Sequence, residues 1–369
     1  MDRGMIPVYR TTLAGNERRY VNECLETTWI SSKGRFIDLF ERSFAAYTGA
    51  AHAVAVCNGT VALHLALVAL GIGPGDEVIV PSLTYVASAN AVAYTGATPV
   101  FADSRRDTWQ IDPEDVARRI TPRTRAIMAV HLYGHPCDMD ALAEVAARHG
   151  VVIVEDCAEA FGTLYRGRHV GTFGEVGTFS FYGNKTITCG EGGMITTSRG
   201  DIRERLAHLR NQGADPRRRY WHDAIGYNYR MTNIAAAIGL AQLERADAII
   251  EAKRQLARWY DEALSGMAVG TQREVGDVRH TWWMYSVLLP DGIDRDAVMG
   301  RLEARGVETR PLFYPVHTLP MYARGGARLP VAEDLARRGM NLPSWPGLTE
   351  EQVRFIVREL QEALRHCGC

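Results

Sequence analysis

The chain has 369 residues, of which 46% are hydrophobic and 23% are charged. This length allows about two domains with a buried core, and the composition excludes a disordered or fibrous protein. The 42 basic and 43 acidic residues leave a formal net charge of −1. Because no long run of one sign could follow a phosphate backbone, we do not expect a nucleic-acid partner.

No segment of the sequence is typical of a membrane or secreted protein. The longest mostly apolar stretch, residues 61–72, is shorter than the ~20 residues that cross a bilayer. Residues 1–10 mix charges and a proline with apolar residues and offer no signal-peptide core. Five cysteines lie far apart in the sequence, and Cys367 and Cys369 lie in a tail. We therefore expect free thiols, no metal and a cytoplasmic protein.

From about residue 50, short β-branched runs alternate with helical segments, a pattern typical of an α/β domain with a mostly parallel sheet. Strands are predicted at residues 52–57, 77–80, 98–102, 126–131 and 151–155, with helices between them at 60–70, 85–94, 112–120 and 138–149. Two further short strands next to glycines, at 177–182 and 193–197, predict a hairpin-like edge.

The rest of the chain predicts a second, smaller domain. A long helical periodicity over residues 232–264 predicts one helix that connects the two domains. Beyond it, strands at 282–289 and 307–310 and helices at 294–305 and 349–364 predict an α+β domain. We place the large domain at residues 1–250 and the small domain at residues 251–369.

The triplet Asn58-Gly59-Thr60 stands where the first predicted strand gives way to a helix. Glycine lets a ligand approach the backbone closely, threonine adds a hydroxyl, and the helix start offers free N–H groups and a positive dipole end. A phosphate fits this description. Asn and Thr would also cap a helix that binds no ligand.

The apolar run 151–154 ends in Glu155 and Asp156. Open α/β sheets bind ligands at the carboxyl ends of their strands, where a fixed Asp could hold a cationic nitrogen. A solvated acid or a cap for the next helix explains the same residues equally simply.

Lys185 ends the segment Ser180-Phe181-Tyr182-Gly183-Asn184-Lys185 and is one of three lysines in the chain. Partial burial among small and aromatic residues would lower its pKa, as a Schiff-base lysine requires; a surface charge is the alternative. A phosphate-binding helix start, an aromatic residue at Tyr85, an acid at a strand end and this lysine are, in this order, the parts of a pyridoxal-phosphate site.

Six segments resemble the DegT/DnrJ/EryC1/StrS family of sugar aminotransferases. They are Asn58 to Leu63, Gly71 to Val78, Pro81 to Tyr85, Glu155-Asp156, Ser180 to Gly193 and Gly226 to Met231. The resemblance extends from about Ile6 to Leu364. It implies the aspartate-aminotransferase fold, known as fold type I, with a large domain built on a mostly parallel seven-stranded sheet and a small α+β C-terminal domain. It also implies a homodimer with shared active sites.

The resemblance assigns roles to residues that match the family motifs. Lys185 is the expected catalytic residue and joins the aldehyde of pyridoxal 5'-phosphate as an imine. Asp156 is expected to pair with the pyridinium nitrogen, and Tyr85 to stack on the ring. The expected phosphate contacts are Gly59, Thr60, Ser180 and, from the neighbouring subunit, Asn228. Glu159, three residues after Asp156, is expected in the same cofactor pocket, and the resemblance fixes no single role for it.

Further segments resemble the members that use a GDP-linked sugar. They are Thr27 to Ser32, Pro81 to Tyr85, His131 to Gly134, Arg218 to Trp221 and Asn228 to Asn233, together with Glu159. This likeness implies conversion of GDP-4-keto-6-deoxy-D-mannose to the 4-amino sugar GDP-perosamine, with L-glutamate as donor and 2-oxoglutarate as by-product. Arg230, Arg310 and His317 are candidates for substrate contact.

Three alternatives remain open at this point. The substrate could be a dTDP-linked keto-6-deoxy sugar, because the cofactor machinery would be the same. The protein could be a sugar dehydratase on the same fold, although that branch carries a histidine where this chain has Lys185. It could also be a non-catalytic sensor that has kept the fold.

Overall fold

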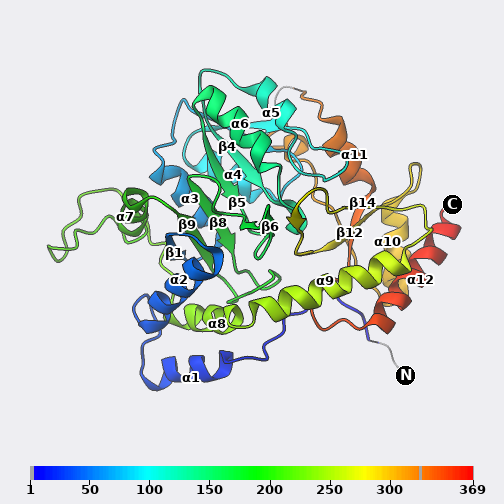
Figure 1. Ribbon diagram of the computed structural model, residues 1–369, viewed down its shortest axis with the longest axis horizontal. Coiled ribbons are helices and arrows are strands. Elements are labelled where there is room, and N and C mark those ends of the chain that lie inside the picture. The colour runs from blue at the N-terminus through cyan, green and yellow to red at the C-terminus, as the bar shows by residue number, and fades with distance from the viewer. Residues whose placement is uncertain (1–3, 324–325, 369) are drawn as a thin grey trace.

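A seven-stranded sheet, in the order β1-β9-β8-β5-β4-β2-β3, forms the centre of the computed structural model, which describes residues 4–323 and 326–368 (Figure 1). The strands are His52–Val56 (β1), Glu77–Pro81 (β2), Thr98–Ala102 (β3), Thr124–Val130 (β4), Val152–Asp156 (β5), Val176–Ser180 (β8) and Gly193–Thr197 (β9). Strands β8, β5, β4, β2 and β3 pair in parallel, and β9 runs against both of its neighbours. The predicted mostly parallel seven-stranded sheet is therefore confirmed.

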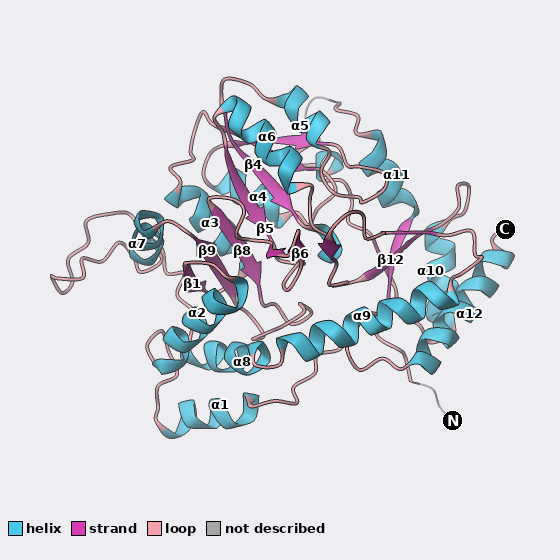
Figure 2. Ribbon diagram, viewed as in Figure 1, coloured by secondary structure: helices cyan, strands magenta, loops and turns pink. Residues whose placement is uncertain are grey.

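Helices cover both faces of this sheet (Figure 2). The helices of the large domain are α1 (Glu17–Glu26), which packs on α8 rather than on the sheet, α2 (Arg35–Thr48), α3 (Gly59–Ala69), α4 (Ala87–Tyr94), α5 (Pro113–Arg119), α6 (Met139–His149), α7 (Gly200–Leu209) and α8 (Asn233–Leu243), with a short 3-10 turn at Leu132–Gly134 (η1). Val78 and Val80 pack with α3, α4 and α7, whereas Ile79 between them packs with α5 and α6. Strands buried on both faces are continuous apolar runs, which is why the sequence predicts them.

The sequence pattern does not predict α1 and α2, which precede the first strand. In α2, Phe36, Phe40 and Phe44 recur every four residues and are buried, as expected of a helix with one apolar face. Gly239 on α8 receives this face, because a Cβ there would lie 2.7 Å from the Phe40 ring. The glycine permits close helix packing rather than breaking its helix.

The helix predicted over residues 232–264 is two helices, α8 and α9 (Ala246–Ala263), with Glu244 and Arg245 between them. Arg245 leaves helical geometry, with φ −111° and ψ 9°. The prediction of one helix is wrong because the apolar periodicity continues through the break. Ile249 and Ile250 pack in the core below the large sheet, while Leu256 and Tyr260 pack in the small domain. Helix α9 thus contributes to two cores, and the domain boundary at residue 250 stays a prediction.

The predicted hairpin is confirmed as the antiparallel pair β8 and β9, but its place at the edge of the sheet is wrong. β1 pairs with β9 and forms that edge instead, with His52 opposite Thr197. The pairing joins segments separated by about 140 residues, which the local sequence pattern could not show.

The small domain contains a four-stranded sheet in the order β10-β12-β14-β13. Its elements are β10 (Gly270–Thr271), β12 (Tyr285–Leu288), α10 (Arg295–Ala304), β13 (Arg310–Pro311), η2 (Val316–Thr318), α11 (Pro330–Arg338), β14 (Gly339–Leu342) and α12 (Glu350–His366). Leu256 of α9, Val298 of α10 and Ile356 of α12 meet in its core. The predicted strands and helices are confirmed within a few residues, and β10, η2, α11 and β14 are additional.

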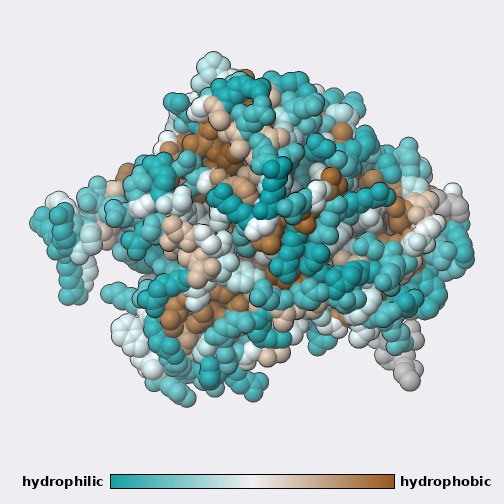
Figure 3. Space-filling model, in the orientation of Figure 1, coloured by the Kyte–Doolittle hydropathy of each residue, from teal (hydrophilic) through white to brown (hydrophobic). Residues whose placement is uncertain are grey.

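A third sheet of three short strands, in the order β11-β6-β7, links distant segments: β6 (Leu164–Tyr165), β7 (Arg168–His169) and β11 (Val278–Arg279). Among the described residues, none of the helices has the length and apolar character of a bilayer span. The face shown in Figure 3 is mostly hydrophilic, with apolar areas between the polar side chains.

Candidate active site

A cavity of about 630 Å³ lies at the carboxyl ends of the parallel strands, where open α/β sheets bind ligands. Residues that follow β1, β2, β5 and β8 line one side, and residues of the small domain close the other. The predicted cofactor contacts that line it are Gly59, Thr60, Tyr85, Asp156, Glu159, Ser180 and Lys185. The structure therefore brings together every predicted cofactor contact except Asn228, which was expected to act from another subunit.

The N-terminus of α3 forms one wall. Asn58 caps the helix, and its side-chain oxygen accepts a hydrogen bond from Val61 N–H at 3.0 Å. The first N–H groups of a helix have no partner within it, so those of Gly59 and Thr60 are available to an anion. A Cβ at Gly59 would lie 2.6 Å from Ser180 Cβ. Glycine is thus required for the close approach of helix start and strand end.

Asp156 ends β5 and is buried, with 5% of its surface exposed. Ser88 Oγ donates to one carboxylate oxygen at 2.8 Å, and Ala158 N–H donates to the other at 3.1 Å. Thr84 Oγ1 lies 3.1 Å from Ser88 Oγ and extends this network. The carboxylate is therefore held in one orientation in the cavity wall, as a partner for a cationic ring nitrogen must be.

The Lys185 amine lies between a carboxylate and an aromatic face. Its Nζ is 3.8 Å from Glu159 Oε1 and 4.0 Å from the centre of the Trp283 ring, and 13% of its side chain is exposed. Burial lowers the pKa of Lys185 below its usual value, and Glu159 and Asp156 oppose part of that shift. A lowered pKa increases the neutral fraction of the amine, which is the nucleophilic form.

Glu159 is held by the backbone of the strained turn after β4. Tyr133 N–H donates to Glu159 Oε2 at 2.8 Å, and Tyr133 itself has a φ of 58°, in the left-handed region that non-glycine residues avoid. Burial raises the pKa of Glu159 to about 7, against the opposing effect of Lys185. This carboxyl therefore changes charge near neutral pH, next to the lysine amine.

Glu155, beside Asp156, supports the strand end rather than lining the cavity. Its carboxylate accepts hydrogen bonds from His131 Nε2 at 3.0 Å and from the N–H groups of Gly171, Phe173 and Gly174, each at 2.7 Å. Burial alone would raise the pKa of Glu155, but these bonds outweigh it and lower the pKa. His131 and Cys157 lie close enough to Glu155 to bind a metal ion together with it. The Glu155 oxygens, however, already accept hydrogen bonds, so we assign no metal to this group.

The aromatic side chains of Tyr85, Trp283 and Phe313 line the cavity, and the buried Tyr133 packs against two of them. The rings of Tyr133 and Phe313 stack with their centres 5.5 Å apart, and Tyr133 is nearly parallel to Trp283 at 6.2 Å. Tyr85 packs against Phe313 at 5.6 Å and is 56% exposed. An exposed tyrosine in the wall of a cavity is available to cover a flat ring, and the stacking role of Tyr85 stays a prediction.

The predicted substrate contacts are not all in this cavity. Arg310 lines it, with Nη2 3.3 Å from Glu308 Oε1. Arg230 lies outside and donates to the side-chain oxygens of Asn211 and Asn228, each at 2.7 Å. His317 is buried in the small domain, with its ring nitrogens 2.6 Å from Ser82 Oγ and 3.4 Å from Glu333 Oε1.

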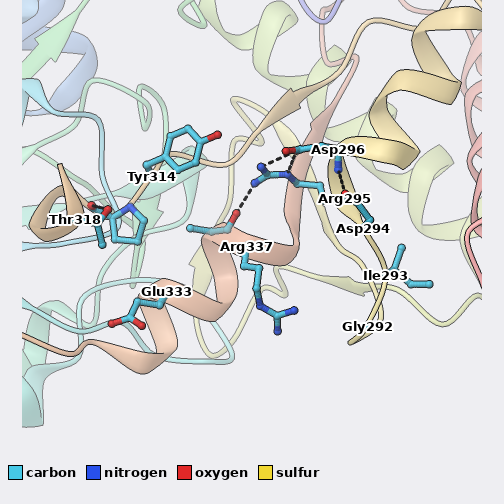
Figure 4. A pocket seen from close by; sticks show the side chains of 11 residues that line it. Gly292, Ile293, Asp294, Arg295, Asp296, Tyr314, Thr318, Glu333 and Arg337 are labelled. Atoms are coloured by element: carbon cyan, nitrogen blue, oxygen red, sulfur yellow. Dashed lines mark hydrogen bonds and ion pairs between the residues drawn. The ribbon is translucent and has the colours of Figure 1, made fainter. Parts of the chain in front are cut away.

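A second cavity, of about 570 Å³, lies in the small domain beside α10 and α11 (Figure 4). Charged groups that line it are paired. Arg295 donates to Asp296 Oδ1 and the Ala336 carbonyl, and Arg337 binds Asp291 and Asp334. The paired charges contrast with the amine, carboxylates and helix start that converge in the first cavity, and we place the chemistry there.

Some lining residues were missed in the sequence. They are Ser88, Asn184, Trp283, Phe313 and Asn341. Ser88 follows Tyr85 at the start of α4, and Asn184 precedes Lys185, so both adjoin motifs that could have suggested them. Trp283, Phe313 and Asn341 come from the other domain, and no local pattern marks them. The side-chain oxygen of Asn184 is buried and has no hydrogen-bond partner among the described residues, as a ligand contact would be before the ligand binds.

These residues fit pyridoxal 5'-phosphate group by group. The open helix start beside Ser180 suits the phosphate, the fixed Asp156 carboxylate suits the pyridine nitrogen, and Lys185 supplies an amine for the aldehyde. The unpaired side-chain oxygen of Asn184, another residue of the cavity lining, is available to the same ligand.

The sequence pattern of the DegT/DnrJ/EryC1/StrS aminotransferase family matches residues 11–361. GDP-perosamine synthase from Escherichia coli O157:H7 is 55% identical over 97% of this chain and 98% of that protein. GDP-perosamine synthase from Caulobacter vibrioides is 52% identical over 98% and 99%. A dTDP-3-amino-3,4,6-trideoxy-alpha-D-glucose transaminase from Streptomyces venezuelae is 43% identical over 89% and 87%.

Solved structures show the same fold. The crystal structure of S. venezuelae DesV, in complex with a ketimine intermediate, superposes with a TM-score of 0.89 at 41% identity over 94% of each chain. The fold and the relatives together define a fold type I aminotransferase that uses pyridoxal 5'-phosphate. The chain belongs to the DegT/DnrJ/EryC1/StrS aminotransferase family.

Proposed function

We propose that this enzyme transfers an amino group from L-glutamate to GDP-4-keto-6-deoxy-D-mannose and forms GDP-perosamine and 2-oxoglutarate. The proposal is supported by the two GDP-perosamine synthases that are 55% and 52% identical over nearly the full chain. The observation that carries the chemistry is the convergence of Lys185, Asp156 and the start of α3 in one cavity.

The residues of the chain divide the work. When bound, pyridoxal phosphate supplies an electron sink for the carbon that carries the amino group. The Gly59 and Thr60 N–H groups and Ser180 would hold its phosphate, and Asp156 would keep the ring nitrogen protonated. Lys185 would hold the cofactor between turnovers and, when released, move a proton on and off the reacting carbon. Tyr85 would cover the ring.

Glu159 and Arg310 are two further charged groups that line the cavity. Glu159, which lies 3.8 Å from the lysine amine, would tune the charge of Lys185 through its own protonation. Arg310 is half exposed at the small-domain wall and would bind an anionic group of a substrate, either the donor carboxylate or the diphosphate of the nucleotide sugar.

We propose that the active enzyme is a homodimer in which Asn228 reaches the phosphate site of the other subunit. Asn228 lies outside the cavity of its own subunit, in the loop between α7 and α8, which extends away from the body of the molecule (Figure 1). Large side chains of this loop are exposed: Tyr220 (84%), Trp221 (48%) and Ile225 (91%). A cluster of exposed apolar residues on a monomer is typical of an interface.

A cytoplasmic location is part of the proposal. The cysteines at positions 24, 57, 137, 157, 189 and 367 are free, which is the usual state in a reducing compartment. Cys369 lies outside the described residues.

Mass spectrometry of the product tests the substrate. Purified enzyme, pyridoxal phosphate and L-glutamate are incubated with GDP-linked and dTDP-linked 4-keto-6-deoxy sugars in parallel. We expect a 4-amino sugar chiefly from the GDP-linked substrate. Faster turnover of the dTDP-linked sugar would favour the alternative that the Streptomyces venezuelae relative represents, and amination of neither would remove the sugar assignment.

Borohydride reduction tests the attachment site. Reduction of the cofactor-loaded protein, followed by peptide mapping, should find a stable adduct on Lys185. The cofactor's absorbance should also change when L-glutamate is added before reduction. A protein that binds the cofactor and shows no change with glutamate would be a sensor rather than an enzyme.

A further inference from the structure

Three consecutive backbone carbonyls of the loop that carries Lys185 each accept a hydrogen bond from a different side chain. Thr11 Oγ1 donates to the Gly183 carbonyl at 2.6 Å, Trp283 Nε1 donates to the Asn184 carbonyl at 2.7 Å, and Tyr9 Oη donates to the Lys185 carbonyl at 2.7 Å. The donors come from the N-terminal segment and from the small domain, far from the loop in sequence.

The N-terminal segment is itself bound to the small domain. The Ile6 N–H donates to the Gly306 carbonyl at 2.8 Å, the Val8 N–H donates to Glu308 Oε2 at 3.0 Å, and the Ser344 N–H donates to the Val8 carbonyl at 2.9 Å. The Tyr9 ring packs against the hydrophobic core of the small domain. It also packs against the hydrophobic cluster that contains Tyr133 and Trp283. All three donors therefore connect the small domain to the lysine loop.

A buried lysine, Lys253, contacts two of the three donors, Trp283 and Tyr9. Lys253 of α9 is fully buried, and its Nζ donates to the carbonyls of Trp283 at 3.1 Å and Ser344 at 2.7 Å. The same amine lies 5.5 Å from the centre of the Tyr9 ring. Lys253 thus ties together the backbone of Trp283, the strand end that holds Val8, and the ring of Tyr9.

The loop position decides where the Lys185 amine lies. The indole of Trp283 binds the Asn184 carbonyl through Nε1 and faces the Lys185 amine, 4.0 Å from the ring centre. Glu159 Oε1 lies 3.8 Å from the same amine. A shift of the loop by about 1 Å would change both contacts and the reach of the amine, and displacements of this size reduce catalysis strongly.

We propose that Tyr9, Thr11 and Trp283 form a clamp, held in place by Lys253, through which the small domain positions the Lys185 amine for the cofactor aldehyde. Tyr9 and Thr11 are positioning residues, because they act through the backbone of the loop. The inference rests on the proposed role of Lys185 as the residue that binds the cofactor.

The test compares Tyr9→Phe and Thr11→Val with the wild-type protein and with Tyr260→Phe. Tyr260 is the matched control, because its buried hydroxyl also donates to a backbone carbonyl, that of Pro343 at 2.9 Å, within the small domain. Hydrogen exchange of the full chain without cofactor is measured on the peptide that covers residues 181–187. Loss of one hydrogen bond should speed its exchange roughly two- to tenfold in Tyr9→Phe, and less in Thr11→Val, whose site is exposed. Tyr260→Phe should match the wild type there.

The second readout is the pH dependence of cofactor attachment, followed by absorbance after pyridoxal phosphate is added. The charged groups that face the amine or line its cavity are Asp156, Glu159, Glu191 and Arg310. A looser loop admits water to the amine, so attachment in Tyr9→Phe should have its midpoint at a higher pH than in the wild type and in Tyr260→Phe. A purely structural defect would lower the melting temperature without moving this midpoint.

Two results would overturn the inference in different ways. If wild-type protein reduced with borohydride carries no adduct on Lys185, the proposed function fails and the clamp has no role. If the adduct forms, and neither the exchange rate nor the midpoint differs between Tyr9→Phe and Tyr260→Phe, the clamp alone is wrong. Thr11→Val provides the same comparison should Tyr9→Phe fold poorly, because Thr11 lies at the surface.

Discussion

The charge state of two buried groups governs the chemistry of the site. Lys185 is a base whose pKa burial lowers, and Glu159 is an acid whose pKa burial raises to about 7. Both shifts favour the neutral form, and the 3.8 Å between the groups couples them. Two donors, Ser88 Oγ and Ala158 N–H, hold the Asp156 carboxylate in place. The cavity thus contains one carboxylate fixed by hydrogen bonds and one whose pKa burial raises.

The substitution Asp156→Asn should weaken the reaction with glutamate by roughly two orders of magnitude or more, because a neutral amide cannot hold the pyridinium proton. The amide has the same shape and can keep its contacts with Ser88 and Ala158, so folding should be unchanged. Stopped-flow absorbance of the loaded protein mixed with glutamate measures the rate. Asp201→Asn, at an exposed site, is the control, and a near-normal rate in Asp156→Asn would contradict the assignment.

The substitution Glu159→Gln should change the pH dependence of stability. The folded pKa of about 7 lies above the ordinary value of 4.5. The stabilisation from the protonated carboxyl is therefore complete below about pH 4.5 and is lost as pH rises to about 7. Over this range the free energy of unfolding of the wild type should fall relative to that of Glu159→Gln, by up to about 3 kcal/mol. Urea unfolding of cofactor-free protein at several pH values measures this difference, and parallel pH curves would refute it.

At the scale of elements, the start of α3 packs against the end of β8 and forms part of the proposed phosphate site. The helix begins with Gly59 directly after its cap, where the ends of β1 and β8 converge. The close contact of Gly59 with Ser180 sets the position of the helix start. The geometry of the phosphate site therefore depends on the lack of a side chain at residue 59.

We therefore expect Gly59→Ala to reduce the affinity for pyridoxal phosphate by roughly tenfold or more, since the added Cβ would lie 2.6 Å from Ser180 Cβ and must push the helix start away. Gly200→Ala is a matched control. Gly200 is also the first residue of a helix, α7, and its Cβ would meet its nearest neighbour at 3.9 Å. Fluorescence titration of both variants with the cofactor measures affinity. Equal affinities would show that the close contact is dispensable.

The sequence predicts the elements of the sheet well because local patterns encode them. The strands β2, β4 and β5 are mostly buried apolar runs, and the helices α3 and α6 have side-chain caps, at Asn58 and Asp138. It fails where packing between distant segments decides. The break at Arg245 and the pairing of β1 with β9 have no local signal. The apolar face of α2 is regular, but the helix precedes the first strand and so lies outside the alternating strand–helix pattern from which the other helices were predicted.

The same distinction applies to the site. Asp156 ends β5, and Gly59 and Lys185 follow the ends of β1 and β8 within a few residues, so their meeting follows from the topology of a parallel sheet. Trp283, Phe313 and Asn341 reach the cavity only because the small domain folds back over the large one. His317 was a candidate on the basis of its segment, and the structure places it against Ser82 and Glu333, away from the cavity.

At the scale of the whole molecule, the proposed dimer would divide each active site between two subunits. Mixing Lys185→Ala with Asn228→Ala tests this arrangement. Each variant alone should be nearly inactive, but half of the dimers formed after exchange of subunits contain one of each. In such a dimer one site has both defects and the other has none. Activity should therefore recover to about a quarter of the wild-type value.

The control is each variant mixed with more of itself, at the same total concentration and after the same exchange treatment. Size-exclusion chromatography checks that both variants have the same assembly state as the wild type. Activity of the mixture that stays at the level of the separate variants, in spite of subunit exchange, would place Asn228 outside the site.

The attachment of residues 6–11 has a consequence for how the protein is made. These residues are synthesised long before their partners Gly306, Glu308 and Ser344, and Val8 precedes Glu308 by 300 residues. The large sheet can assemble during translation, whereas residues 6–11 can dock only after residue 344 has left the ribosome. Capture of the vitamin B6 coenzyme in its final geometry therefore follows the synthesis of residue 344, and a nascent chain stalled before that residue would have an unfinished reactive loop.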